Sequence, residues 1–152
     1  MSEVVKNGWT ATINGMPKVG QLAELSKTMQ QSDIELFSAL SGDRQPLHTN
    51  PELAKASRFG GVIVQGGVTT GLLNAVVAEQ GPGPGTVFLN VNWNFSKPVY
   101  LGDTVTASVE VLEVRADKPI CVIKTVITNQ KGEVCLDGQA TTFTADLKGL
   151  LD

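Results

Sequence analysis

The stretch SGDRQPLHTN, residues 41–50, contains the one histidine of the chain, His48, five positions after Asp43. Histidine changes its charge near neutral pH, so an imidazole beside a carboxylate can exchange a proton with a bound water or a substrate. The same two side chains can instead have a structural role, as a helix cap or as an ion pair at the surface. The residue types therefore indicate either a general acid–base site or a structural histidine.

The backbone between Asp43 and His48 must curl if their side chains are to meet. In an extended chain, five residue steps separate two Cα atoms by roughly 16–18 Å, whereas groups that share one water need polar atoms within about 6 Å. Gly42 permits a left-handed turn, and Pro46 favours extended geometry at Gln45. We therefore expect residues 43–48 to form a curled loop.

Two short helices are expected on either side of this loop. The segment IELFSAL, residues 34–40, is amphipathic, with Ser32 or Asp33 as its N-cap and Gly42 at its end. After the loop, Asn50 and Pro51 have the residue types of an N-cap and a first helical position. Asp43 and His48 should thus lie between two helix ends.

The middle of the chain favours one buried helix over residues 68–78. Large apolar residues recur there at helical spacing, small residues occupy the other sides, and the pair Gly66–Gly67 precedes the helix. Four alternating apolar patterns follow, at residues 87–95, 105–111, 120–127 and 133–144, separated by turns such as 115–119 and 129–132. GWTATI, residues 8–13, predicts a further short strand, whereas residues 21–31 are compatible with helix or strand. The plan is α+β, with an antiparallel sheet wrapped around one helix.

Composition limits the classes of function. With 152 residues and 41% hydrophobic content, we expect a single domain over residues 1–152. A net charge of −3 offers no broad cationic field for nucleic acid, and no apolar run approaches the ~18 residues of a membrane span. Cys121 and Cys135 fit neither a metal-ligand spacing nor a disulfide framework, and residues 1–20 lack the pattern of a signal peptide. We expect a cytoplasmic protein without a metal.

The segment FSALSGDRQPLHTNPELAKAS resembles the signature of the MaoC-like dehydratases and (R)-specific enoyl-CoA hydratases. In that pattern an aromatic residue precedes Ser-Gly-Asp, two residues, Pro-Leu-His and a small residue, here Ala54. The later segment NWNFSKPVYLGDTV and a Lys-Pro turn at 118–119 also match, so the resemblance covers roughly residues 20–145. It implies the hot-dog fold, a curved antiparallel sheet around one helix, usually assembled as a dimer. It also favours a strand for AELSKTMQ.

The resemblance implies the reversible syn addition of water to a trans-2-enoyl-CoA, which gives an (R)-3-hydroxyacyl-CoA. Asp43 and His48 would activate the water, and the backbone N–H of Gly66 would stabilise the negative charge on the thioester oxygen. Asn74 stands where relatives often carry a serine near the catalytic water. It could orient that water, or it could simply be a helix residue bonded to a loop.

Further residues are expected to contact the substrate. Gln45 replaces a usual asparagine and Gln65 a frequent histidine, and both keep a polar hydrogen-bonding group; Gly67 follows the proposed oxyanion donor. The two glycines could equally serve to let the helix pack closely. Arg44, Lys55, Arg58, Lys97 and Lys118 could each be solvated charges, but two or three of them could meet the phosphates of coenzyme A, and we expect Arg58, Lys97 and Lys118 to do so. Coenzyme A would be part of the substrate, and no separate cofactor is expected.

Two other functions remain open on this fold. The protein could be a non-catalytic acyl-CoA-binding or assembly subunit, because one fold hosts several functions. It could also be a thioesterase, although such enzymes generally carry a carboxylate on the central helix, and residues 68–78 contain no Asp or Glu. In each case an apolar slot beside the central helix and FGGVIVQGG should hold the acyl chain. A homodimer is expected, because residues 86–95 would otherwise leave an open, apolar sheet edge.

Overall fold

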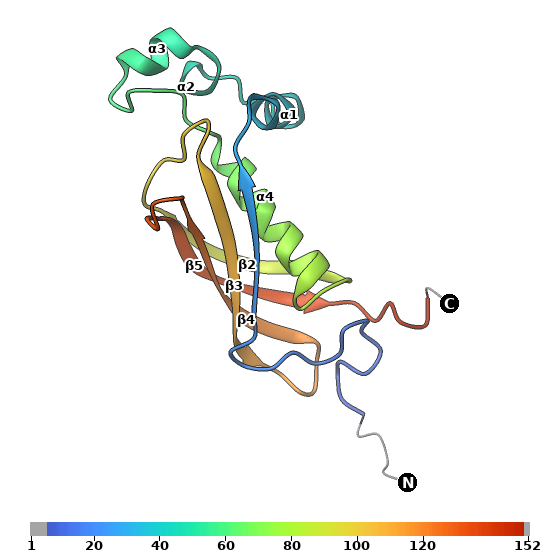
Figure 1. Ribbon diagram of the computed structural model, residues 1–152. Coiled ribbons are helices and arrows are strands. Elements are labelled where there is room, and N and C mark those ends of the chain that lie inside the picture. The colour runs from blue at the N-terminus through green and yellow to red at the C-terminus, as the bar shows by residue number, and fades with distance from the viewer. Residues whose placement is uncertain (1–5, 151–152) are drawn as a thin grey trace.

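A five-stranded antiparallel sheet curves around a central helix in the computed structural model, which describes residues 6–150 (Figure 1). The spatial order is β1-β3-β4-β5-β2, so that β1 and β2 form the two edges. The strands are β1 Leu22–Thr28, β2 Thr86–Phe95, β3 Thr104–Val114, β4 Ile120–Thr128 and β5 Val134–Thr144. This arrangement is the predicted α+β hot-dog fold. The predicted domain also includes residues 1–5 and 151–152, which lie outside the described range.

The core lies between the inner face of the sheet and the central helix. Alternate residues of β3 are buried, as the period of a strand with one covered face requires: Val105, Ala107, Val109 and Val111. The central helix is α4, Gly66–Ala75, continued by one π-helical segment, η1, Val76–Gln80. Leu73, Val76 and Val77 pack into the core, whereas Gly71 and Asn74 are exposed. The helix is therefore covered on one side, and its other side is open.

Strand β2 departs from the simple alternation that its sequence suggests. The pairing with β5 shifts between Phe88 and Asn90, so Leu89 is an extra, bulged residue. Phe88 lies opposite buried Thr142, and Trp93 packs edge-on against Phe88 with ring centroids 5.6 Å apart. Phe88, Val91, Trp93 and Phe95 therefore share one face of the strand, on which Phe88 and Trp93 are half-buried and Val91 and Phe95 are exposed. The expectation that Val87 and Leu89 share the face of Trp93 was wrong, because the bulge moves the alternation by one residue.

The predicted strand at residues 8–13 was also wrong, because this segment forms turns. Thr12 N donates to Trp9 O at 3.0 Å, and Trp9 N donates to Asn7 Oδ1 at 2.7 Å. The indole is fully buried and donates from Nε1 to Arg115 O at 2.6 Å. Local hydrogen bonds and the buried Trp9 side chain therefore stabilise these turns in place of the hydrogen bonds that a strand would make with its neighbour. The ambiguous segment that follows contains β1, as the family resemblance implied.

Three short helices lie beyond one end of the sheet, near the N-terminus of α4 (Figure 1). They are α1 Gln31–Ser41, α2 Pro46–Thr49 and α3 Pro51–Ala56. The predicted N-cap of α1 was wrong: the cap is Gln30, whose N–H donates to Asp33 Oδ2 at 2.8 Å. The predicted end at Gly42, with φ of 83°, and the predicted cap of α3 at Asn50 were confirmed. None of the helices in residues 6–150 is long and apolar enough to span a membrane.

Candidate active site

Asp43, in the turn after α1, meets His48, which lies in α2 and not in a loop, as was expected for residues 43–48. His48 Nε2 lies 3.7 Å from Asp43 Oδ2, and His48 Nδ1 lies 2.6 Å from the carbonyl oxygen of Ile63. Because a carbonyl oxygen can only accept, Nδ1 must carry a hydrogen, and in the neutral imidazole Nε2 then has a free lone pair. His48 is 6% exposed, whereas the Asp43 side chain is 38% exposed. A ligand can therefore reach the pair from the side of Asp43.

The distance between these two side chains suits a shared water. Direct hydrogen bonds from nitrogen to oxygen span about 2.7–3.2 Å, so 3.7 Å is too long for one. A water placed within hydrogen-bond distance of both atoms can donate one hydrogen to Asp43 Oδ2 and one to His48 Nε2. The structure thus brings the two predicted residues together in an arrangement that can hold and deprotonate a water.

The local sequence explains the curl of the backbone. Gly42 takes the left-handed conformation that ends α1, and Asp43 N donates to Ser41 Oγ at 3.0 Å. The single turn of α2 then places His48 N 3.0 Å from Gln45 O. Gln45 N lies 3.4 Å from Asp43 Oδ1, while the side chain of Gln45 is exposed. Gln45 therefore acts here through its main chain.

Gln65 was expected to contact the substrate. Its side chain does not extend into a cleft but points into the protein. It is 2% exposed, and its Nε2 donates to Ser38 Oγ at 3.0 Å, Ile34 O at 3.3 Å and Asp43 O at 3.5 Å. Ser38 Oγ in turn donates to Asp43 O at 2.9 Å. Ser38 was missed at the level of sequence. Its spacing of four from Ile34 on the buried face of an amphipathic helix was the available signal.

Gly66 and Gly67 begin α4 and allow two aromatic rings to approach it. A Cβ atom on Gly66 would lie 2.9 Å from Cε1 of Phe95, and one on Gly67 would collide with the ring of Phe37. Both glycines thus have a packing role. Within residues 6–150 the N–H of Gly66 has no hydrogen-bond acceptor. It is a free donor at the positive end of the helix dipole, which suits an oxyanion.

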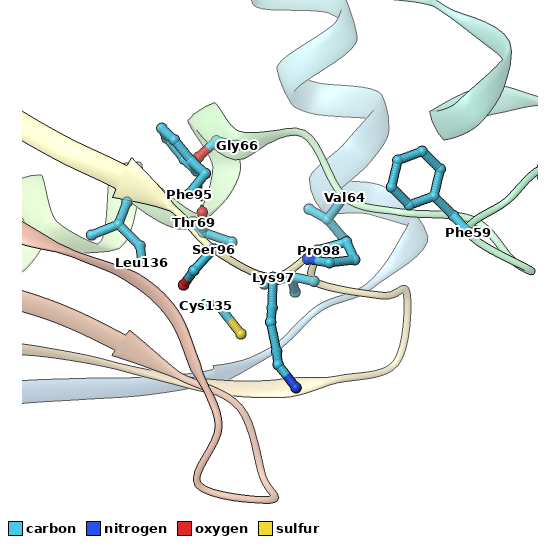
Figure 2. Close-up of a pocket in the computed structure, with 11 residues that line it drawn as sticks. Phe59, Val64, Gly66, Thr69, Phe95, Ser96, Lys97, Pro98, Cys135 and Leu136 are labelled. Carbon is cyan, nitrogen blue, oxygen red and sulfur yellow. Dashed lines mark hydrogen bonds between the residues drawn. The ribbon is translucent and has the colours of Figure 1, made fainter.

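A pocket of about 340 Å³ adjoins Gly66 (Figure 2). Its wall is mostly apolar, with Phe59 and Phe95 at opposite sides in this view, and Ser96 and Lys97 also line it. Neither Asp43 nor His48 lines this pocket. The backbone around Ile63 and Val64 connects the two regions, because the Ile63 carbonyl faces His48 while Val64 lines the pocket.

Two side chains of this pocket have perturbed pKa values. A hydrogen bond and an ion pair with Glu133 raise the pKa of Lys97, and the same contact lowers the pKa of Glu133. Burial raises the pKa of the Cys135 thiol, which therefore stays protonated at neutral pH and is a poor nucleophile. Cys135 thus contributes to the pocket as a small apolar residue.

The remaining predicted residues are dispersed. Arg58 is exposed and directly precedes Phe59, which lines the pocket, but Arg58 itself does not line it. Lys118 lies in the turn between β3 and β4, at the opposite end of the sheet from α1–α3 (Figure 1), so the structure does not bring it to the site. Asn74 is exposed, and its Nδ2 donates to Thr70 O of its own helix at 3.4 Å.

Comparisons with known proteins identify the family of this chain. The profile of the MaoC like domain matches residues 13–131. An (R)-specific enoyl-CoA hydratase from Aeromonas caviae is 40% identical over 123 residues, which are 81% of this chain and 92% of that protein. Another from Rhodospirillum rubrum is 40% identical over 126 residues, 83% of this chain and 87% of that protein. The solved (R)-hydratase from A. caviae, described as involved in PHA biosynthesis, matches with a TM-score of 0.82 and 38% identity, over 85% of this chain and 98% of that one. The chain therefore belongs to the MaoC-like dehydratase family.

Proposed function

We propose that this protein catalyses the reversible syn addition of water to a trans-2-enoyl-CoA, giving an (R)-3-hydroxyacyl-CoA. The observation that carries the proposal is the Asp43–His48 pair, in which Ile63 fixes the imidazole and the 3.7 Å separation lets one water contact both polar atoms. The names of the relatives from A. caviae and R. rubrum support the same substrate class and stereochemistry.

In the proposed reaction one water donates to both Asp43 Oδ2 and His48 Nε2, with a lone pair directed at C3. As the oxygen bonds to C3, Asp43 takes one proton, and the C2–C3 π electrons move so that negative charge develops on the thioester oxygen. The proton taken by Asp43 is then delivered to C2 through His48 Nε2. The pair regains its starting protonation state, and the substrate has gained the elements of one water.

The charge on the thioester oxygen needs a donor, which we assign to the Gly66 N–H. One preorganised donor of this kind contributes roughly 10²–10³-fold to kcat, and the start of a helix adds a favourable dipole. Asn74 is a second candidate for orienting the water. Its hydrogen bond to Thr70 O, at 3.4 Å, is long enough to be exchanged readily.

We propose that the apolar pocket beside Gly66 receives the acyl chain. With the chain in this pocket, the thioester carbonyl lies next to the free N–H of Gly66. Lys97, which lines this pocket, and Arg58, which precedes the lining residue Phe59 in the chain, are candidates for binding the phosphates of coenzyme A. Lys97 would have to exchange its ion pair with Glu133 to do so. The chemistry consists of proton transfers and charge stabilisation, so it requires no metal or separate cofactor.

We also propose a homodimer that forms through β2. Within residues 6–150 this strand pairs with β5 alone, and its exposed residues include four apolar ones, Val87, Leu89, Val91 and Phe95, beside three asparagines, Asn90, Asn92 and Asn94. The other edge, β1, exposes mainly polar side chains, including Glu24, Ser26 and Thr28. Cytoplasmic localisation is supported by two buried cysteines, Cys121 and Cys135, that are both free thiols.

The test is incubation with crotonyl-CoA while the absorbance of the conjugated thioester and the concentration of free thiol are followed together. Hydration removes the absorbance without releasing thiol, and chiral analysis of the product should give the (R)-alcohol. Release of thiol would identify a thioesterase instead. Loss of neither signal, together with binding of the acyl-CoA, would favour a non-catalytic subunit and contradict the proposal.

A further inference from the structure

We infer that Gln65 is a positioning residue, which acts with Ser38 to hold the backbone of Asp43 at a fixed distance from the oxyanion donor at Gly66. The inference rests on the proposed function. It assigns the Gln65 side chain to the protein interior rather than to the substrate, on the basis of its burial and its three hydrogen bonds.

The orientation of the Gln65 amide follows from its neighbours. Two of the three atoms around Nε2 are carbonyl oxygens, of Ile34 and Asp43, which can only accept. The NH₂ group must therefore face them. Ser38 Oγ donates its hydrogen to Asp43 O at 2.9 Å and accepts from Gln65 at 3.0 Å. The carbonyl of Asp43 thus receives hydrogen bonds from two buried side chains.

These contacts restrict where the Asp43 carboxylate can lie. The N–H of Asp43 is held by Ser41 Oγ at 3.0 Å and its carbonyl by Ser38 and Gln65, so both flanking peptide groups are anchored. Rotation about two side-chain bonds is then the freedom that remains to the carboxylate. Because Gln65 directly precedes Gly66, its side chain and its main chain together connect the base to the oxyanion donor.

The reaction needs this separation to be constant. Water attacks C3 while charge gathers on the oxygen at C1, so the base and the donor act at two points of one rigid enoyl thioester. A misplacement of about 1 Å can cost roughly 10²-fold in rate. Gln65 holds the loop of Asp43 against the start of α4, and it can therefore raise kcat without contacting the substrate.

The other end of the amide supports the inference. Gln65 Oε1 is buried and has no hydrogen-bond partner within residues 6–150, a condition that costs stability. A methionine has a similar length and would avoid this cost. If the site only needed to be filled, the amide would be the poorer choice, so the donor Nε2 supplies something that an apolar side chain cannot.

The experiment compares Gln65→Met with the unchanged protein in the crotonyl-CoA assay. We expect kcat to fall roughly 10–100-fold while KM changes less than about twofold, because the substrate site is intact. The melting temperature should change little, since the lost hydrogen bonds are offset by removal of the unpaired oxygen. Ser38→Ala should lower kcat as well, and the double variant should lose less than the product of the two single losses.

Thr125→Val is the matched control. Thr125 is fully buried on β4, its Oγ1 also lacks a partner within residues 6–150, and β4 carries none of the proposed site residues. This variant should keep its kcat. A raised KM with unchanged kcat in Gln65→Met would restore Gln65 as a substrate contact, and a lowered melting temperature with unchanged kcat would leave it a purely structural role. Either result overturns the inference alone, whereas an unchanged protein that does not hydrate crotonyl-CoA overturns the proposed function and this inference with it.

Discussion

His48 Nε2 lies 3.7 Å from Asp43 Oδ2, while Nδ1 of the same ring is held 2.6 Å from the carbonyl oxygen of Ile63. A structural pair of these residues would be expected to close to a charge-assisted hydrogen bond of about 2.7–2.9 Å. Here the buried ring is anchored on one side only, and its second nitrogen faces a half-exposed carboxylate across a gap. This geometry favours a catalytic role of the pair over a structural role.

The oxyanion role of Gly66 can be tested by removing one N–H. Gly66 is the first residue of α4, where proline is favoured, and Gln65 has the extended backbone, φ −59° and ψ 139°, that a following proline requires. Gly66→Pro should therefore fold but lose about 10²-fold in kcat. Gly66→Ala adds a similar contact with Phe95 and keeps the N–H, so it is the control. Equal kcat in the two variants would exclude the N–H as the oxyanion donor.

Gly67→Ala should be destabilising, in contrast to Gly66→Ala. The new Cβ would collide with the half-buried ring of Phe37, which lies between α1 and α4, whereas Phe95 beside Gly66 is exposed and can move. Overpacking of this kind costs about 1–3 kcal/mol, and thermal melting of the two variants would measure it. If the two variants melted at the same temperature, the close packing of α1 on α4 would not be important for stability.

The dimer should depend on β2 and not on β1. Leu89 on β2 is 57% exposed and Leu22 on β1 is 67% exposed, so lysine at either position leaves the core unchanged. We expect Leu89→Lys to shift sedimentation at micromolar concentration from dimer to monomer mass, because lysine on an edge opposes strand pairing. Leu22→Lys should keep the dimer mass. Monomer mass for the unchanged protein would contradict the dimer itself.

Narrowing the pocket should discriminate against long acyl chains. Ser96 is an exposed residue that lines the pocket, so Ser96→Trp should fill it without disturbing the core. We expect kcat/KM for 2-octenoyl-CoA to fall roughly tenfold more than that for crotonyl-CoA. Asn94→Trp, at an exposed position on β2 two residues earlier in the chain, should affect both substrates equally. Equal effects of the two variants would place the acyl chain elsewhere.

The sequence was most informative where local chemistry decides the structure. Gly42, Pro46 and Asn50 have residue types that dictate turns and caps, and the structure has those features at those positions. The alternation of β3 over residues 105–111 was equally reliable, because one face of this part of the strand packs on the core. The meeting of Asp43 with His48 followed from these local signals together with the family resemblance.

The remainder depends on contacts between distant segments, which a single sequence does not reveal. The bulge at Leu89 arises from the pairing of β2 with β5, and the turns around Trp9 depend on an acceptor at Arg115. The burial of Gln65 likewise depends on Ser38, which is 27 positions away. Residue type alone suggested that Gln65 contacts the substrate. An amide side chain can form hydrogen bonds with a ligand or with the protein, and the residue type does not distinguish the two cases.

The most direct test of the account is turnover of crotonyl-CoA by Asp43→Asn, His48→Ala and the double variant, measured with thermal melting of each. If both residues act on one water, each single change should lower kcat by about 10²–10⁴-fold at a nearly unchanged melting temperature, and the double variant should be little worse than either. A structural pair predicts the reverse, with roughly 1–3 kcal/mol of stability lost and turnover per folded molecule kept. A destabilised but fully active His48→Ala would contradict the catalytic role of the pair.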